Sequence, residues 1–128
     1  MKARIVIGSL KGNVQGLGKD IVAAALKSRG FEVVDLGANV SPSAFVGAAV
    51  KERAEVIAIS ISMEETLPLL KEMTDILRRK KLRDRIRIVI GGNAVSESTL
   101  KEYSVDAYAR DAWDCVKKVE RLVAKQSR

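Results

Sequence analysis

Short apolar runs and longer amphipathic segments alternate along the chain. The short runs are rich in Val and Ile, as in strands covered on both faces of a parallel sheet, and they span 3–7, 32–36, 56–60, 87–90 and 107–109. The longer segments place apolar residues at helical spacing, over 19–29, from 42, over 64–80, from near 96 and over 111–124. The pattern therefore predicts five consecutive strand–helix units.

Cap and turn residues mark the ends of several predicted helices. Gly30 should cap the C-terminus of the first helix, and Ser41, followed by a proline, should cap the N-terminus of the second. Pro68 is expected in the first turn of the third helix. The first helix should bury a stripe that includes Ile21 and Leu26.

Alternating units of this length predict a single α/β domain over residues 1–128, with helices on both faces of a doubly wound parallel sheet. The expected fold is flavodoxin-like, or Rossmann-like, with strand order 2-1-3-4-5. In this order the ligand crevice lies at the carboxyl ends of strands one and three. The loops that reach this crevice are 8–18, 60–64, 91–93 and 110–111.

Composition narrows the classes of function. The chain has no histidine, which excludes sites that need imidazole, and its one cysteine, Cys115, cannot form an internal disulfide. Apolar runs are strand-sized and the first residues lack a secretory signal, so we expect a cytoplasmic protein without membrane contact. The basic segment 78–87 is interpreted as a solvated helix end. With only five aromatic residues, nucleic-acid binding is the weakest alternative.

The glycine-rich loop after the first strand does not match the common phosphate-binding motifs. A Walker A loop would need glycine at Asn13 and a hydroxyl at Asp20, and a dinucleotide fingerprint would need glycine at Ile21. A phosphoacceptor receiver would need acidic residues after the first strand and an aspartate in place of Ser60. We therefore exclude these three classes.

Three short motifs do occur in order: Asn-Val-Gln-Gly-Leu-Gly at 13–18, Ser-Ile-Ser at 60–62 and Gly-Gly at 91–92. Together, and with flanking segments 30–37 and 106–112, they resemble the cobalamin-binding domain of corrinoid methyl-carrier proteins and adenosylcobalamin mutases. That family carries Asp-x-His-x-x-Gly, Ser-x-Leu and Gly-Gly at these places. The resemblance covers nearly the whole chain.

The resemblance implies a corrinoid site at the carboxyl edge of the sheet. In the family the loop histidine binds cobalt, the aspartate orients it, and the nucleotide arm of the cofactor enters a slot beside the sheet. The glycines would let the chain approach that arm, and the first serine of the Ser-x-Leu motif would hydrogen-bond to its base. The implied cofactor-binding residues are Asn13, Gln15, Gly16, Gly18, Ser60, Ser62, Met63, Gly91, Gly92 and Tyr108.

This sequence departs from the family at the position of the cobalt ligand. Gln15 replaces the histidine, and Asn13 replaces the aspartate that orients it. A carboxamide oxygen is a poor donor to cobalt, so Gln15 is expected to be a weak or indirect metal ligand only. The lower cobalt face would then carry water, no ligand or the cofactor's own base. We expect easier reduction of cobalt than in a Gln15→His variant.

Simpler interpretations remain for individual residues. Asn13 and Gln15 could form an ordinary polar turn, and the glycine pair at 91–92 could serve only a turn with positive φ. Cys115 is expected to be buried, and Trp113 is expected to pack against the protein.

Two functions follow from these observations. The first is a cobalamin-carrying module that presents the upper corrin face to a separate methyltransferase or mutase subunit, with a homo-oligomer also open. The second is a cofactor-free regulatory or protein-interaction domain. Since the sequence shows no nucleophile, base or metal triad, we expect a cofactor-carrying subunit rather than an enzyme in isolation.

Overall fold

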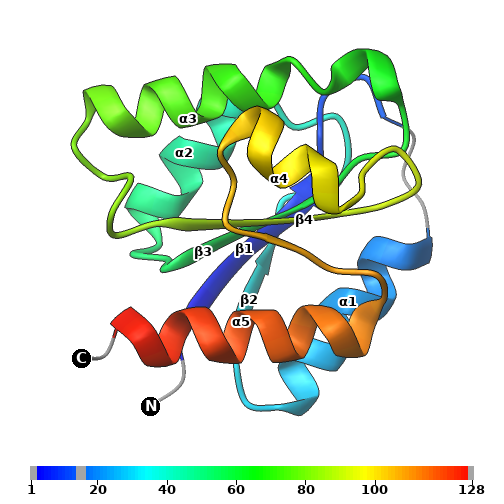
Figure 1. Cartoon of the computed structure of the whole chain (residues 1–128). Helices are drawn as coiled ribbons and strands as arrows, with labels where there is room; N and C mark the ends of the chain where they lie inside the picture. The colour runs from blue at the N-terminus through cyan, green and yellow to red at the C-terminus, as the bar shows by residue number, and fades with distance from the viewer. Residues whose placement is uncertain (1–2, 14–16, 127–128) are drawn as a thin grey trace.

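The computed structural model describes residues 3–13 and 17–126, in which five strands alternate with helices (Figure 1). The strands are β1 (Arg4–Ser9), β2 (Glu32–Asp35), β3 (Val56–Ser60), β4 (Arg87–Gly91) and β5 (Ala107–Tyr108). The helices are α1 (Leu17–Ser28), α2 (Pro42–Lys51), α3 (Leu69–Arg79), α4 (Glu97–Tyr103) and α5 (Ala112–Gln126), with a 3-10 helix η1 (Glu64–Thr66) before α3.

The sheet is parallel throughout and its order is β2-β1-β3-β4-β5, which confirms the predicted fold class. Ser9, Ser60 and Gly91 are neighbours in register, so the three central strands end level with one another. This level edge is the carboxyl edge, where ligands bind in doubly wound sheets.

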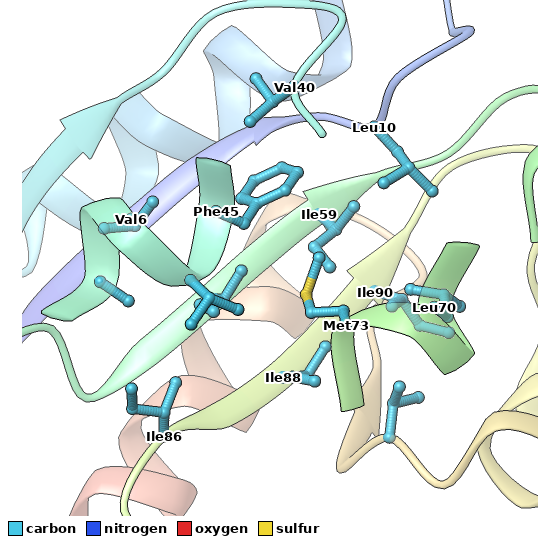
Figure 2. Close-up of a cluster of buried hydrophobic side chains, with 14 of the residues drawn as sticks. Val6, Leu10, Val40, Phe45, Ile59, Leu70, Met73, Ile86, Ile88 and Ile90 are labelled. Atoms are coloured by element: carbon cyan, nitrogen blue, oxygen red, sulfur yellow. The ribbon is translucent and has the colours of Figure 1, made fainter. Parts of the chain in front are cut away.

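Two apolar layers hold the helices on the sheet. Helices α2, α3 and α4 cover one face, and α1 and α5 cover the other (Figure 1). Figure 2 shows the first layer, in which Phe45 of α2 and Met73 of α3 meet strand residues such as Ile59. On β1, Val6 belongs to this layer, whereas Ile7 belongs to the layer beneath α1 and α5.

The helix caps follow the sequence prediction. Ser41 caps α2, where its Oγ accepts a hydrogen bond of 3.2 Å from the backbone N–H of Ala44. Gly30 takes a φ of +90° just after α1, a conformation that glycine adopts at little cost. Ser96 caps α4.

Three local expectations are wrong. Pro68 is the N-cap of α3 and not part of its first turn, because the preceding chain forms the separate turn η1. Ile21 is 50% exposed, whereas Leu26 is buried, because Ile21 borders a cavity. Trp113 is 58% exposed, because the inward side of α5 is taken by residues such as Cys115.

Within residues 3–13 and 17–126, no helix combines the length and the hydrophobicity that a bilayer crossing requires. The same residues contain no group of three or more His, Cys, Asp or Glu side chains that could hold a metal ion. Cys115 is a free, buried thiol, as predicted.

Candidate cofactor-binding site

A cavity of about 320 Å³ opens at the carboxyl edge, on the face of the sheet that α1 and α5 cover. Its floor is formed by the central strands and its two walls by the first turns of α1 and α5. The lining consists of Ile7, Ala58, Ile59, Ser60, Val89, Ile90, Gly91, Gly92 and Ala109 near the sheet, Gly18, Lys19, Ile21 and Val22 on α1, and Arg110, Asp111, Ala112 and Cys115 beside or on α5. Four predicted site residues, Gly18, Ser60, Gly91 and Gly92, therefore meet in one cavity.

The glycine pair after β4 is explained partly by the backbone. Gly92 has a φ of +113°, and a Cβ there would lie 2.3 Å from the carbonyl oxygen of Ile61, so the turn itself requires glycine. A Cβ on Gly91 would approach the carbonyl oxygen of Ala109 to 3.3 Å. The simple turn interpretation thus accounts for Gly92 without a ligand.

Gly18 has no such explanation. It lies in the first turn of α1 and its φ is not positive. Apart from its chain neighbours and the backbone of its own helix, a Cβ placed on it would meet no atom of the described residues within 4 Å. Glycine at a helical position costs about 1 kcal/mol relative to alanine. Gly18 lines the cavity, so its missing side chain leaves room there for a group that enters.

Asn13 joins the loop after β1 to the loop after β3. Its side-chain nitrogen donates to the carbonyl oxygen of Leu10 at 2.9 Å and to Oγ1 of Thr66 at 2.9 Å, with a longer bond of 3.4 Å to Lys11. Its side-chain oxygen accepts from the backbone N–H groups of Ser62 and Met63 at 2.6 and 2.7 Å. The side chain is buried, with 6% exposure.

This arrangement suits a carboxamide rather than a carboxylate. An ionised aspartate has no hydrogen to donate to the carbonyl oxygens of Leu10 and Lys11, whereas the NH₂ group of Asn13 bonds to both. Asn13 is therefore a link between two loops. Gln15 and Gly16 lie outside the described residues, so their roles, and the orientation of Gln15 by Asn13, stay predictions.

The remaining predicted residues lie beside the cavity or behind it. Ser62 and Met63 belong to the loop that Asn13 holds, and neither lines the cavity. Tyr108 packs against the apolar layer under α2, α3 and α4, on the other face of the sheet. Its carbonyl oxygen accepts a hydrogen bond of 2.8 Å from Lys118 of α5.

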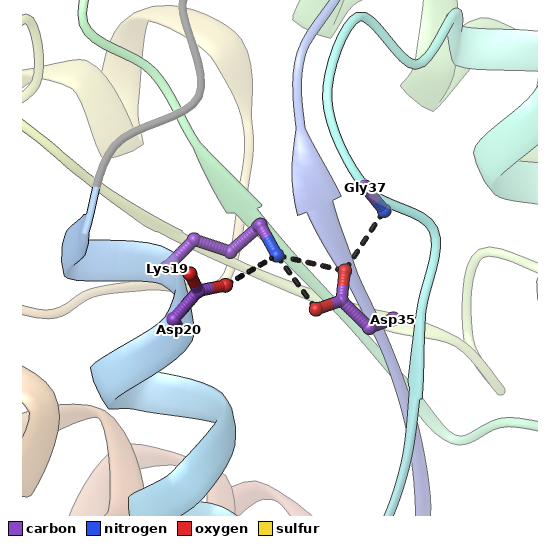
Figure 3. A network of polar contacts seen from close by, with 4 residues as sticks. All are labelled: Lys19, Asp20, Asp35 and Gly37. Carbon is purple, nitrogen blue, oxygen red and sulfur yellow. Dashed lines mark hydrogen bonds and ion pairs between the residues drawn. The ribbon is translucent and has the colours of Figure 1, made fainter.

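Lys19 forms a buried ionic group at the wall of the cavity (Figure 3). Its Nζ lies 2.6 and 2.8 Å from the two carboxylate oxygens of Asp35 and 3.0 Å from Asp20. Asp35 also accepts a hydrogen bond of 2.8 Å from the backbone of Gly37. These contacts tie the first turn of α1 to the end of β2.

Burial and pairing act in opposite directions on this group. Burial alone would lower the pKa of Lys19, but the hydrogen bonds to Asp35 and Asp20 outweigh it and raise this pKa above its ordinary value. Burial would raise the pKa of Asp35, but the bonds from Lys19 and from the Gly37 N–H lower it overall. Both residues of the pair are therefore charged at neutral pH.

Several residues that line the cavity were not predicted as site residues from the sequence. Ile21, Ala58, Ala112 and Cys115 carry ordinary apolar or small side chains, which give no signal of their own. The exposed position of Ile21 in an otherwise buried stripe becomes visible only in the structure. Burial raises the pKa of the Cys115 thiol to about 12, so this residue contributes shape rather than reactivity.

The fold, the cavity and the glycine pattern define a cofactor-binding α/β domain, and comparison with known proteins gives its family. The B12 binding domain family matches residues 3–115. This chain belongs to that family.

Relatives and solved structures agree with this assignment. The chain is 35% identical over 120 residues to dimethylamine corrinoid protein 3 of Methanosarcina mazei, covering 94% of this chain and 72% of the relative. It superposes with a TM-score of 0.88 and 29% identity on a cobalamin-binding protein from Desulfitobacterium hafniense DCB-2, covering 94% of this chain and 58% of that one.

A third similarity is to the methanol:cobalamin methyltransferase complex MtaBC from Methanosarcina barkeri. The TM-score is 0.87 with 29% identity, and the match covers 95% of this chain and 46% of the matched chain. The chain thus spans between about half and three quarters of the length of these three proteins.

Proposed function

We infer that this chain binds a corrinoid and carries it, for methyl transfer, to a separate partner protein. The observation that carries this conclusion is the cavity at the carboxyl edge, where Gly18 lies in the lining together with Ser60 and Gly91. The cavity suits the nucleotide arm of cobalamin because its lining is mostly apolar and includes one hydroxyl residue near the sheet, Ser60.

The chain's own residues have three tasks in this function. Ser60 hydrogen-bonds to the nucleotide arm, and Gly18 and Gly91 leave room for it beside α1 and β4. Apolar residues such as Ala58 and Val89 keep water from the floor of the cavity. Cobalt would supply a centre that accepts and releases a methyl group, and Gln15 would take part weakly or not at all.

The upper face of the corrin is left to a partner. The similarity to one chain of a methyltransferase complex supports a separate methyltransferase subunit as that partner. A cytoplasmic location and a homo-oligomer are part of the same proposal. Gel filtration with and without the cofactor measures the oligomeric state.

The test is retention of the cofactor by the purified chain. The chain is mixed with hydroxocobalamin or methylcobalamin, passed through a desalting column, and its visible spectrum is recorded. We expect a red or pink protein fraction with close to one corrinoid per chain. A colourless protein fraction with both cofactors would favour the alternative, a cofactor-free regulatory domain.

A further inference from the structure

Ser9, the last residue of β1, carries a buried hydroxyl without a hydrogen-bond partner among the described residues. The residue has 0% exposure, and its Oγ makes no hydrogen bond within the described part of the chain. Its backbone is fully paired: the N–H donates to Gly37 at 2.9 Å, and the carbonyl accepts from Val40 at 2.9 Å. Within the described residues, the polar group of Ser9 that lacks a hydrogen bond is therefore its side-chain hydroxyl alone.

A lone buried hydroxyl destabilises the folded state, because the hydrogen bonds that it makes to water in the unfolded chain are not replaced. The rest of β1 avoids this cost, since its core positions are Ile5, Val6 and Ile7. Alanine would fill the same position without a polar atom. The cost of this serine would be offset if its hydroxyl formed a hydrogen bond in a ligand-bound state of the protein.

Ser9 lies beside the cavity, directly next to its lining, although it is not itself one of the lining residues. Side chains alternate along a strand, so Ser9 projects from the same face of the sheet as Ile7, which lines the cavity. Ser9 is also the register partner of Ser60, which lines the cavity from the neighbouring strand. The two serines thus lie side by side at the carboxyl edge, about 4.8 Å apart along the direction of the sheet hydrogen bonds.

We propose that Ser9 is a second hydroxyl of the corrinoid site and that it donates a hydrogen bond to the nucleotide arm when the cofactor is bound. The phosphodiester, ribose and base of that arm carry acceptor atoms, and a serine hydroxyl supplies one donor. This inference rests on the proposed function. It adds a binding residue that none of the three sequence motifs contains.

The first test uses the cofactor-free protein. Ser9→Ala removes the unpaired hydroxyl, so the urea midpoint of unfolding should rise relative to the wild type. Thr74→Val is the matched control, because Thr74 is equally buried but its Oγ1 donates to Lys71 at 3.0 Å. That variant should lower the midpoint. A lowered midpoint in Ser9→Ala would mean that Ser9 serves the fold, which would overturn the inference.

The second test separates the nucleotide arm from the corrin ring. Binding of cobalamin and of cobinamide, which lacks the nucleotide, is measured by titration of the wild type and of Ser9→Ala. Ser9→Ala should weaken cobalamin binding roughly three- to tenfold and leave cobinamide binding unchanged. Equal cobalamin affinities in the two proteins would overturn the role of Ser9 alone. Failure of the wild type to bind either corrinoid would overturn the proposed function together with it.

Discussion

The side-chain nitrogen of Asn13 donates a 2.9 Å hydrogen bond to Oγ1 of Thr66, a residue 53 positions further along the chain. Thr66 in turn donates to the carbonyl oxygen of Met63 at 2.7 Å, and Met63 donates its N–H to Asn13. These three residues close a ring of hydrogen bonds. The ring fixes the loop after β1 against the loop after β3.

A double-mutant cycle tests this link. Asn13→Ala leaves several buried groups unpaired and should lower the free energy of unfolding by about 2–3 kcal/mol, and Thr66→Val should lower it by about 1 kcal/mol. The two changes remove one shared hydrogen bond. The loss in the free energy of unfolding of the double variant should therefore be smaller than the sum of the two single losses, by about 0.5–1.5 kcal/mol. Urea unfolding gives the free energy of unfolding of the wild type, the two single variants and the double variant. Strictly additive losses would mean that the two side chains act independently.

A pair of glycines separates ligand binding from helix stability. Gly18 in α1 and Gly47 in α2 both lie in helices. Apart from its chain neighbours and its own helix backbone, a Cβ on either would meet no atom within 4 Å in residues 3–13 and 17–126. Each change to alanine should raise the free energy of unfolding by about 0.5–1 kcal/mol. Only Gly18→Ala should weaken cobalamin binding, since only Gly18 borders the cavity. Equal cobalamin affinities in the two variants would remove the main argument for the site.

The Lys19 and Asp35 pair gives a pH dependence of stability. Folding lowers the pKa of Asp35 from its ordinary value of 3.8. Its contribution to the free energy of unfolding is therefore complete above pH 3.8 and is lost as the pH falls through the lower pKa of the folded state. Folding raises the pKa of Lys19 from its ordinary value of 10.5. Its contribution to the free energy of unfolding is therefore complete below pH 10.5 and is lost as the pH rises through the higher pKa of the folded state. The pair therefore stabilises the fold most between these two values.

Lys19→Met makes this measurable, because methionine keeps the packing of the lysine stem and removes its charge. At pH 7 the free energy of unfolding of the variant should be lower than that of the wild type by about 1–2 kcal/mol. This loss is smaller than for a fully buried ion pair, because Asp35 is partly exposed. The difference from the wild type should shrink below pH 3.8 and above pH 10.5. Urea midpoints across this range give the profile. A difference that stays constant with pH would show that the loss is one of packing alone.

Cys115 reports on the wall of the cavity. Its pKa is raised from 9.0 to about 12, so at pH 8 its thiolate fraction is lower than that of an ordinary thiol by about a thousandfold. Ellman's reagent should therefore react very slowly with the folded protein and rapidly in denaturant. Bound cobalamin should slow the reaction further, because Cys115 lines the cavity that the nucleotide arm would fill. Rapid labelling of the folded protein would contradict the burial of this wall.

The fold could be predicted from local signals because strands and helices alternate with clear periodicity. The runs that became β1, β3 and β4 are continuous and apolar, and the Ser41 and Gly30 caps have direct physical causes. Strand order followed from general rules for parallel sheets. These features depend on neighbours in sequence or on chirality, which a single sequence contains.

The site could be predicted only in part. Gly18 and Ser60 were found because they belong to short motifs. Cys115 was missed as a lining residue, and Ser9 as a neighbour of the lining, because their significance depends on which elements lie above them. Tyr108 shows the reverse case: one position along β5 decides the face of the sheet, and it places this side chain away from the cavity.

The central claim is that the cavity between α1 and α5 holds the nucleotide arm of a corrinoid. Crystals of the chain grown with hydroxocobalamin test it most directly, through the electron density of the bound cofactor. We expect continuous density for the arm inside the cavity, next to Gly18, Ser60 and Gly91. Density for the arm outside the cavity, with the cavity closed by protein side chains, would show that the cavity is not the site of the nucleotide arm.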